Sequence, residues 1–236
     1  MPDYEEIYRQ QAGPYEDLVS REDYQGHILP ALERIASLHG KAVVDLGAGT
    51  GRLACLLAPL AGALCAFDRS HAMLSVAVAK LRAGGRRNWT AALADHRAIP
   101  LTDAWADVVV SGWSVCYLVV WHPDDWQAQL ERGLAEMRRI LRPIGSLILL
   151  ETLGTGVETP HPPQQMLNYL SYLEKAGFRR TWIRTDYRFE SRPQAETLTS
   201  FFFGEAMLEK LVERPEGVFL PECTGIWTLT TARIDL

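Results

Sequence analysis

A short glycine-rich segment follows the first strongly apolar stretch of the chain and restricts the folds that the sequence can adopt. Ala42, Val43 and Val44 lead into DLGAGTGR at residues 45–52, and a helical apolar pattern covers residues 51–60. Glycines between a strand and a helix let a ligand approach the backbone, and they expose the N–H groups of the helix N-terminus to an anion. The segment therefore predicts a Rossmann-like ligand-binding turn.

From residue 41 onward, short apolar runs alternate with helical patterns, which is typical of a parallel sheet with crossover helices. Strands are expected at residues 41–46, 62–67, 88–93, 107–111 and 145–150, and helices at 51–60, 71–82 and 124–141. Beyond them we expect a helix at 164–176, strands at 181–187 and 226–234, and a helical insertion at about 189–215 before the last strand. The predicted fold is α/β and Rossmann-like, with a doubly wound, mostly parallel seven-stranded sheet and a reversed edge strand.

The length of 236 residues indicates a single domain with an elaboration. We expect residues 1–40 to form an N-terminal helical lid, with a helix from Ser20 to Leu38 that is kinked at Pro30. Residues 41–236 are expected to form the main domain. A monomer or a homodimer is expected.

Charge and apolar patterning exclude several classes of partner. The formal net charge is −5 and no long basic run occurs, so neither nucleic acid nor an anionic membrane is expected as a partner. The start of the chain lacks a basic leader, and no apolar run reaches the roughly 20 residues of a membrane span, which predicts a cytoplasmic location. The four cysteines are scattered, so we expect free thiols and no metal site.

The composition of the glycine-rich turn argues against two common nucleotide ligands. A nicotinamide fingerprint needs a third glycine where this chain has Arg52. A phosphate-binding loop needs a lysine after its glycines, and none follows them here. A smaller anion, such as an amino-acid carboxylate, suits the turn better.

Polar residues also follow the next two expected strands. Asp68 comes directly after the strand at 62–67, where a carboxylate can bind both hydroxyls of a ribose. Asp95 and His96 follow the strand at 88–93 and suit the amino group of an adenine. All three positions lie at the carboxyl edge of the predicted sheet, where open α/β sheets bind their ligands.

Five segments occur in a characteristic order and spacing: VVDLGAGTGRL, AFD, ADHRAIPL, ADVVVSGW and AEMRRILRPIGSLILLE. In these segments the chain resembles the class I S-adenosylmethionine-dependent methyltransferases, and in particular the small-molecule branch that includes ubiquinone and menaquinone biosynthesis methyltransferases. The resemblance implies methyl transfer to a small, apolar or aromatic acceptor at O, N or C, with release of S-adenosylhomocysteine. The sequence lacks the motifs with which such enzymes methylate nucleic-acid bases. It also has Pro143-Ile144-Gly145 where the family usually has Pro-Gly-Gly.

The resemblance implies roles for individual residues as well. The acceptor pocket would include Tyr8, Trp113, Tyr117 and Phe202. The cofactor would be held by residues of the lid, of the glycine-rich turn and of the strand ends: Tyr15, Asp45, Gly47, Ala48, Gly49, Asp68, Arg69, Met73, Asp95, His96, Ser111 and Gly112. An aromatic face in the lid suits a sulfonium cation.

The sequence assigns no catalytic base. Positioning alone can accelerate methyl transfer, although a base would help if the acceptor is a hydroxyl or an acidic carbon. The candidates in loops at the expected carboxyl edge are Tyr117, His122, Glu151 and His161. Three alternatives stay open: a non-catalytic S-adenosylmethionine-binding regulatory module, a nicotinamide-dependent oxidoreductase, and methylation of protein or RNA.

Overall fold

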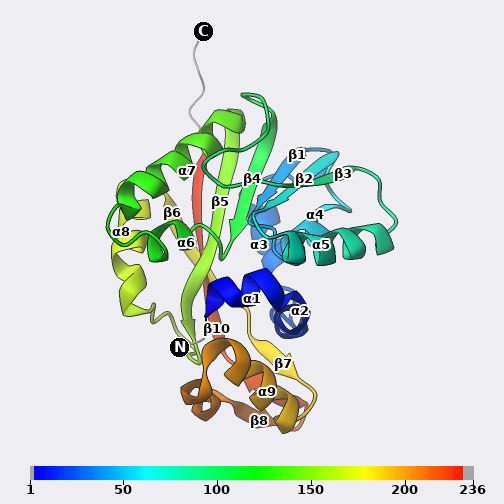
Figure 1. Cartoon of the computed structure of the whole chain (residues 1–236), viewed down its shortest axis with the longest axis vertical. Coiled ribbons are helices and arrows are strands. Elements are labelled where there is room, and N and C mark those ends of the chain that lie inside the picture. The colour runs from blue at the N-terminus through cyan, green and yellow to red at the C-terminus, as the bar shows by residue number, and fades with distance from the viewer. Residues whose placement is uncertain (1–2, 231–236) are drawn as a thin grey trace.

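A central sheet organises the computed structural model, which describes residues 3–230 (Figure 1). Its strands are β1 (Ala42–Leu46), β2 (Ala63–Asp68), β3 (Trp89–Leu93), β4 (Ala106–Gly112), β5 (Leu141–Thr155), β6 (Arg179–Arg184) and β10 (Glu222–Thr230). They lie in the order β3-β2-β1-β4-β5-β10-β6, and β10 runs antiparallel to both of its neighbours. The predicted seven-stranded, mostly parallel sheet is confirmed. Its reversed strand is β10, which lies one place in from the edge.

Helices cover both faces of this sheet, as expected for a doubly wound fold (Figure 1). One face carries α6 (Tyr117–Val120), α7 (Trp126–Ile140) and α8 (Leu167–Lys175), which a short 3₁₀ turn η1 (Gln164–Met166) precedes. The other face carries α3 (Ile28–Ile35), α4 (Arg52–Leu57) and α5 (His71–Ala83). Ser70 caps α5 by accepting a hydrogen bond from the Met73 N–H.

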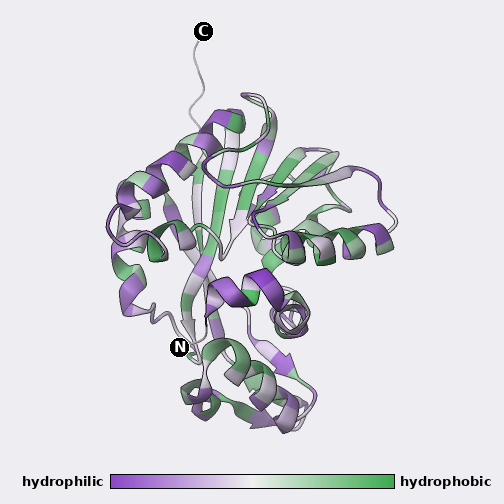
Figure 2. Cartoon of the chain, viewed as in Figure 1, coloured by the Kyte–Doolittle hydropathy of each residue, from purple (hydrophilic) through white to green (hydrophobic). Residues whose placement is uncertain are grey.

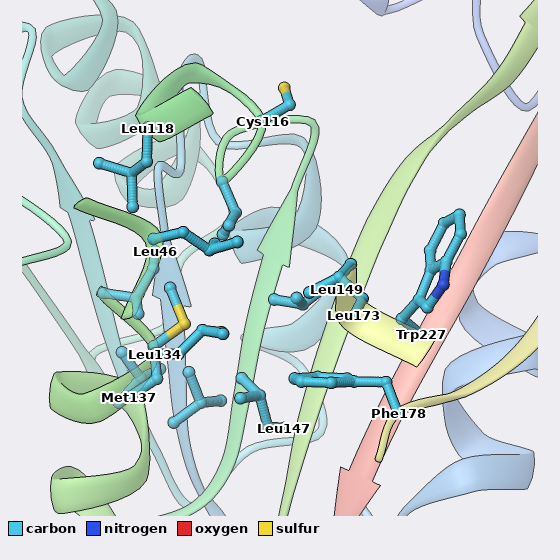
Figure 3. Packing of buried hydrophobic residues seen from close by; sticks show 14 of the residues in the cluster. Leu46, Cys116, Leu118, Leu134, Met137, Leu147, Leu149, Leu173, Phe178 and Trp227 are labelled. Atoms are coloured by element: carbon cyan, nitrogen blue, oxygen red, sulfur yellow. The ribbon is translucent and has the colours of Figure 1, made fainter. Parts of the chain in front are cut away.

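The side chains of the strands alternate between the two faces, as the period of two in a strand requires. In β1, Val43 packs under α3 and α4, whereas Val44 packs under α7. In β5, Leu147 and Leu149 face α7 and α8, while Ile148 faces the other side. Figure 3 shows the first of these cores, and Figure 2 shows that the outer surfaces of the covering helices are mostly hydrophilic.

The N-terminal region differs from its predicted form. Two short helices, α1 (Tyr4–Gln10) and α2 (Ala12–Val19), precede a turn, and the helix expected from Ser20 begins only at Ile28. Asp23 has a positive φ of 57°, and its carboxylate accepts hydrogen bonds from the N–H groups of His27 and Ile28. The expected helix from Ser20 to Leu38 is therefore wrong. Pro30 lies in the first turn of α3, where a missing N–H costs nothing and no kink arises.

The insertion before β10 contains a sheet that the sequence did not predict. Strands β7 (Tyr187–Phe189), β8 (Val212–Arg214) and β9 (Gly217–Leu220) pair in the order β7-β9-β8. They pack against α9 (Arg192–Phe203) and the 3₁₀ segment η2 (Glu205–Lys210). The strand expected at 181–187 is divided between two sheets, and the predicted end of the last strand at Ile234 lies outside the described residues. Leu18 of α2 completes this small core, which joins the lid to the insertion.

No helix among residues 3–230 combines the length and the apolar character that a membrane span requires.

Truncation of Leu134 tests the packing of α7 on the sheet. Leu134 is fully buried in the core of Figure 3, so we expect Leu134→Ala to lower the free energy of unfolding by about 2–5 kcal/mol. Urea denaturation measures this loss. Leu93 is 54% exposed, and Leu93→Ala, as the control, should change the same quantity by less than about 0.5 kcal/mol. Equal losses in the two variants would contradict the assignment of the core.

Candidate functional site

A cavity of about 650 Å³ lies at the carboxyl edge of the parallel strands. The turns after β1, β2, β3 and β4 form its floor, and α6, α1 and Tyr15 of α2 form its walls. In Figure 1, α1 lies across this end of the sheet. The cavity brings together thirteen of the residues predicted from the sequence: Tyr8, Tyr15, Gly47, Gly49, Asp68, Arg69, Met73, Asp95, His96, Gly112, Trp113, Tyr117 and His122.

The glycine-rich turn exposes its backbone to this cavity. Gly47 and Gly49 have positive φ angles of 68° and 55°, which favour glycine. A Cβ atom at Gly47 would lie 1.8 Å from the Ser114 Oγ, so no side chain fits there. A Cβ at Gly49 would meet nothing within 4 Å. The turn is thus tightly packed at Gly47 and open at Gly49.

Asp68 joins the turns that follow β1 and β2. Its Oδ2 accepts a hydrogen bond from the Gly49 N–H at 2.8 Å, and its Oδ1 accepts one from the Ser70 N–H at 2.7 Å. Burial raises the pKa of this carboxyl, while the two N–H groups oppose the shift. A carboxylate has about four lone-pair sites, so Asp68 keeps capacity for the hydroxyls of a ligand.

Asp45, Ala48 and Ser111 do not line the cavity, and the side chains of all three are buried. The Ser111 hydroxyl donates to the Leu46 carbonyl at 2.8 Å. Asp45 is 1% exposed, and burial raises its pKa to about 7. The Ala54 N–H faces the Asp45 carboxyl and opposes the shift, but neither carboxylate oxygen has a hydrogen-bond partner of normal geometry among the described residues.

The end of β3 supplies a polar cluster. Arg97 holds Asp95 with two hydrogen bonds of 2.7 Å each, which lowers the pKa of the Asp95 carboxyl to about 2. The His96 Nε2 lies 3.0 Å from the Ser114 Oγ. Burial lowers the pKa of His96 to about 4, so the ring is neutral at pH 7. His96 and Ser114 therefore support the glycine-rich turn from below, while Asp95 stays ionised.

Aromatic rings from three segments form the opposite end of the cavity. The hydroxyl oxygens of Tyr8 and Tyr117 are 2.5 Å apart. Tyr117 stacks on Trp121 with ring centroids 4.5 Å apart, and Tyr15 packs edge-on against Tyr8 at 5.4 Å. Phe202 of the insertion packs on Tyr15 at 5.5 Å but does not line the cavity.

Trp113 separates the aromatic part of the cavity from a cluster formed by Arg52, Glu22 and Tyr187. Its ring lies under the Arg52 guanidinium, with 3.7 Å between the guanidinium carbon and the ring centroid. Arg52 makes an ion pair with Glu22, and the Tyr187 hydroxyl donates to the same Glu22 carboxylate at 2.8 Å. The residue that replaces the third glycine of a nicotinamide site thus connects the turn to the lid and to the insertion.

Only two of the four candidate bases line the cavity, namely Tyr117 and His122. Glu151 is 1% exposed and lies behind the wall, where its Oε1 accepts hydrogen bonds from the Tyr169 hydroxyl at 2.8 Å and the Cys116 N–H at 3.1 Å. Burial raises the pKa of Glu151 to about 7. His161 follows β5 and does not line the cavity.

Several lining residues were missed in the sequence, among them Ser70, Arg97, Ser114, Leu118 and Trp121. Ser114 lies in the loop after β4, and Trp121 directly follows α6. A helical spacing of four links Tyr117 to Trp121, and this spacing could have indicated that the two rings share a face.

Comparison with known proteins identifies a similar domain within the chain. Residues 44–149 match the family model described as a methyltransferase domain. The chain is 35% identical over 134 residues to the malonyl-[acyl-carrier protein] O-methyltransferase of Geobacter sulfurreducens, a match that covers 53% of this chain and 45% of the relative. It is also 35% identical over 115 residues to the ubiquinone/menaquinone biosynthesis C-methyltransferase UbiE of Ralstonia pickettii, with coverages of 48% and 43%. The chain thus spans less than half the length of each of these relatives.

Solved structures share the fold at lower identity. One is described as a putative methyltransferase from Bacillus halodurans, with a TM-score of 0.59, 20% identity, and coverage of 88% of this chain and 100% of that one. The resemblance to class I methyltransferases of the small-molecule type is confirmed by these matches. They also support S-adenosylmethionine as the cofactor.

The residues of the cavity fit this cofactor. Asp68 offers a carboxylate for a ribose diol, and the open side of Gly49 leaves room for a ligand against the backbone. The buried carboxyl of Asp45, which lacks a regular partner, lies below the turn that would hold an amino-acid group. The ring faces at the aromatic end suit a sulfonium cation.

Removal of the Asp68 carboxylate tests the ribose assignment. We expect Asp68→Ala to weaken the binding of S-adenosylhomocysteine by about 1.5–3 kcal/mol, because charge-assisted hydrogen bonds are lost. Isothermal titration calorimetry measures the dissociation constant. Asp124 is exposed and does not line the cavity, and Asp124→Ala should leave the constant unchanged. An unchanged constant in Asp68→Ala would contradict the assignment.

Glu151 predicts a pH dependence of stability. Its pKa is raised from 4.5 to about 7 in the folded state, so its contribution to stability is present below pH 4.5 and is lost as the pH rises through 7. Glutamine does not titrate and keeps an acceptor oxygen. The stability of Glu151→Gln relative to the unmodified chain should therefore rise by about 1–3 kcal/mol between pH 4.5 and pH 8.

Urea unfolding at the two pH values measures this difference. The control is Glu174→Gln, since the Glu174 side chain is 46% exposed and should give nearly the same difference at both pH values. A constant difference for Glu151→Gln would contradict the raised pKa.

Proposed function

We propose that this chain is an S-adenosylmethionine-dependent methyltransferase that acts on a small, apolar or aromatic molecule and releases S-adenosylhomocysteine. One observation carries the proposal. A single cavity joins a carboxylate suited to ribose and an open glycine-rich turn at one end to an aromatic chamber at the other. The matched methyltransferase domain and the curated relatives support the same activity.

S-adenosylmethionine, when bound, supplies a methyl group that its sulfonium makes electrophilic. Asp68, the turn at Gly47 and Gly49, and the cluster at Asp95 and His96 would hold the cofactor along the strand ends. Tyr8, Tyr15 and Tyr117 would exclude water from the other end of the cavity and present aromatic rings to the cation. This division of the cavity leaves the space between Trp113 and Tyr117 for the acceptor.

Positioning is the main contribution that these residues can make. Burial raises the pKa of Tyr8 and of Tyr117 well above 10, so neither phenol is a base at neutral pH. Burial raises the pKa of Glu151 to about 7, but this carboxyl does not line the cavity. It accepts hydrogen bonds from the Cys116 N–H and the Tyr169 hydroxyl. Of the four candidate bases, His122 is then the one that lines the cavity without being excluded, and alignment of the two reactants supplies the rest of the acceleration.

The size and enclosure of the cavity favour a small acceptor over protein or RNA. A volume of about 650 Å³ lies within the range of small-molecule sites, and residues of α1 line the cavity. A polymer would need an extended groove.

The four free cysteines support a reducing compartment, and we infer a cytoplasmic location.

Transfer of a labelled methyl group tests the proposed activity. The purified chain is incubated with methyl-labelled S-adenosylmethionine and a cell extract, and the products are separated into small molecules, protein and nucleic acid. We expect label in a small molecule that organic solvent extracts, and a loss of this label with Asp68→Ala but not with Asp124→Ala.

The distribution of label separates the alternatives. Label in protein or RNA would contradict the small-molecule acceptor. Binding of S-adenosylhomocysteine without any transfer would favour a non-catalytic regulatory module. Binding of NADH instead would favour an oxidoreductase.

A further inference from the structure

Two half-buried tyrosines from distant parts of the chain meet at the aromatic end of the cavity. Tyr8 comes from α1 of the lid and Tyr117 from α6, yet their hydroxyl oxygens are 2.5 Å apart. Both side chains line the cavity. The two hydroxyls therefore face each other at the boundary between the lid and the chamber.

The mutual hydrogen bond leaves this pair with unused capacity. Two phenols carry two O–H donors, and their contact uses one donor and one lone pair. No other hydrogen bond to either hydroxyl occurs among residues 3–230. Because burial raises both pKa values, both protons are retained at neutral pH, so one O–H remains available.

Contacts that do not involve the hydroxyls hold both rings in place. The main-chain carbonyl of Tyr8 accepts a hydrogen bond of 2.5 Å from the Ser70 hydroxyl. Tyr117 stacks on Trp121, and the preceding residue Cys116 donates its N–H to the buried Glu151 carboxylate. The position of each hydroxyl is therefore set before a ligand arrives.

Two charged groups near the pair have ionic partners: Arg97 pairs with Asp95, and Arg9 pairs with Glu6. The Arg69 guanidinium lies over the Trp121 ring, 5.0 Å from its centroid. The rings of Trp113 and Trp121 offer flat apolar surfaces within the same cavity. A neutral donor between flat rings suits a planar molecule that carries an oxygen, since a buried O–H without a partner costs free energy.

We propose that the Tyr8–Tyr117 pair donates a hydrogen bond to an oxygen of a planar aromatic acceptor, a ring hydroxyl or a ring carbonyl. This inference rests on the proposed function and names its substrate class. Because one hydroxyl belongs to the lid and the other to α6, both elements build the binding site for the oxygen.

Binding of two matched probes tests the proposal. The chain is saturated with S-adenosylhomocysteine, and its affinities for 1-naphthol and 1-methylnaphthalene are measured by titration. The probes share a ring system and differ in the presence of a hydroxyl. We expect 1-naphthol to bind more tightly than 1-methylnaphthalene. Tyr8→Phe or Tyr117→Phe should lower the affinity for 1-naphthol by about three- to tenfold and have little effect on the affinity for 1-methylnaphthalene.

Two controls keep the result specific. Tyr24 is 37% exposed and packs on Phe219 outside the cavity, so Tyr24→Phe should retain the full preference for 1-naphthol. The affinity for S-adenosylhomocysteine, measured on every variant, shows whether the fold and the cofactor site are intact.

The other outcomes overturn the proposal. An absence of preference in the unmodified chain, or a preference that survives in both phenylalanine variants, would show that the pair binds no oxygen. Failure of both probes to bind would exclude the planar acceptor. S-adenosylhomocysteine binding separates these failures from a failure of the proposed function, which would instead abolish cofactor binding or methyl transfer.

Discussion

The Asp68 carboxylate connects the turns after two neighbouring parallel strands, and the arrangement of the cavity depends on that connection. Its two oxygens accept hydrogen bonds from the N–H of Gly49 and from the N–H of Ser70. Ser70 in turn caps α5 and donates its hydroxyl to the main chain of the lid. One half-buried carboxylate thus connects the glycine-rich turn, the start of a helix and the main chain at Tyr8. Because parallel strands end at a common edge, all these groups meet without any long connection.

The walls of the cavity come from segments that are packed on one another as well as on the sheet. Leu18 of the lid lies in the core of the insertion, and Tyr187 of the insertion donates a hydrogen bond to Glu22, which pairs with Arg52. Arg52 begins the helix after the glycine-rich turn and covers Trp113. The lid, the insertion and the cofactor turn are therefore linked through a buried ion pair. A buried pair of this kind is costly to break by removal of one partner, because the remaining charge is left without compensation.

The sequence predicts the parts of this structure that depend on local pattern. The parallel strands and the turn at residues 45–52 follow from apolar periodicity and from glycine, and Asp68 follows from its place at a strand end. Contacts between residues that lie far apart in the chain are not predicted in this way. The pairing of Tyr8 with Tyr117, of Glu22 with Arg52 and of Glu151 with Tyr169 depends on tertiary packing that no local signal encodes. The helix expected from Ser20 was wrong for a local reason, because the Asp23 side chain stabilises a turn that apolar spacing alone does not reveal.

The place of β10 in the sheet has a consequence for the biosynthesis of the chain. β6 pairs within the sheet with β10 alone, and β10 separates it from β5. A ribosome that has completed β6 must still add about forty residues before residues 222–230 become available, so β6 waits without a partner throughout that interval. Trp227, which fills the core against α8, arrives with the same segment. The five strands from β3 to β5 can assemble before residues 222–230 are made, whereas β6 can join the sheet only after them, and an unpaired strand edge is open to association with other chains in the meantime.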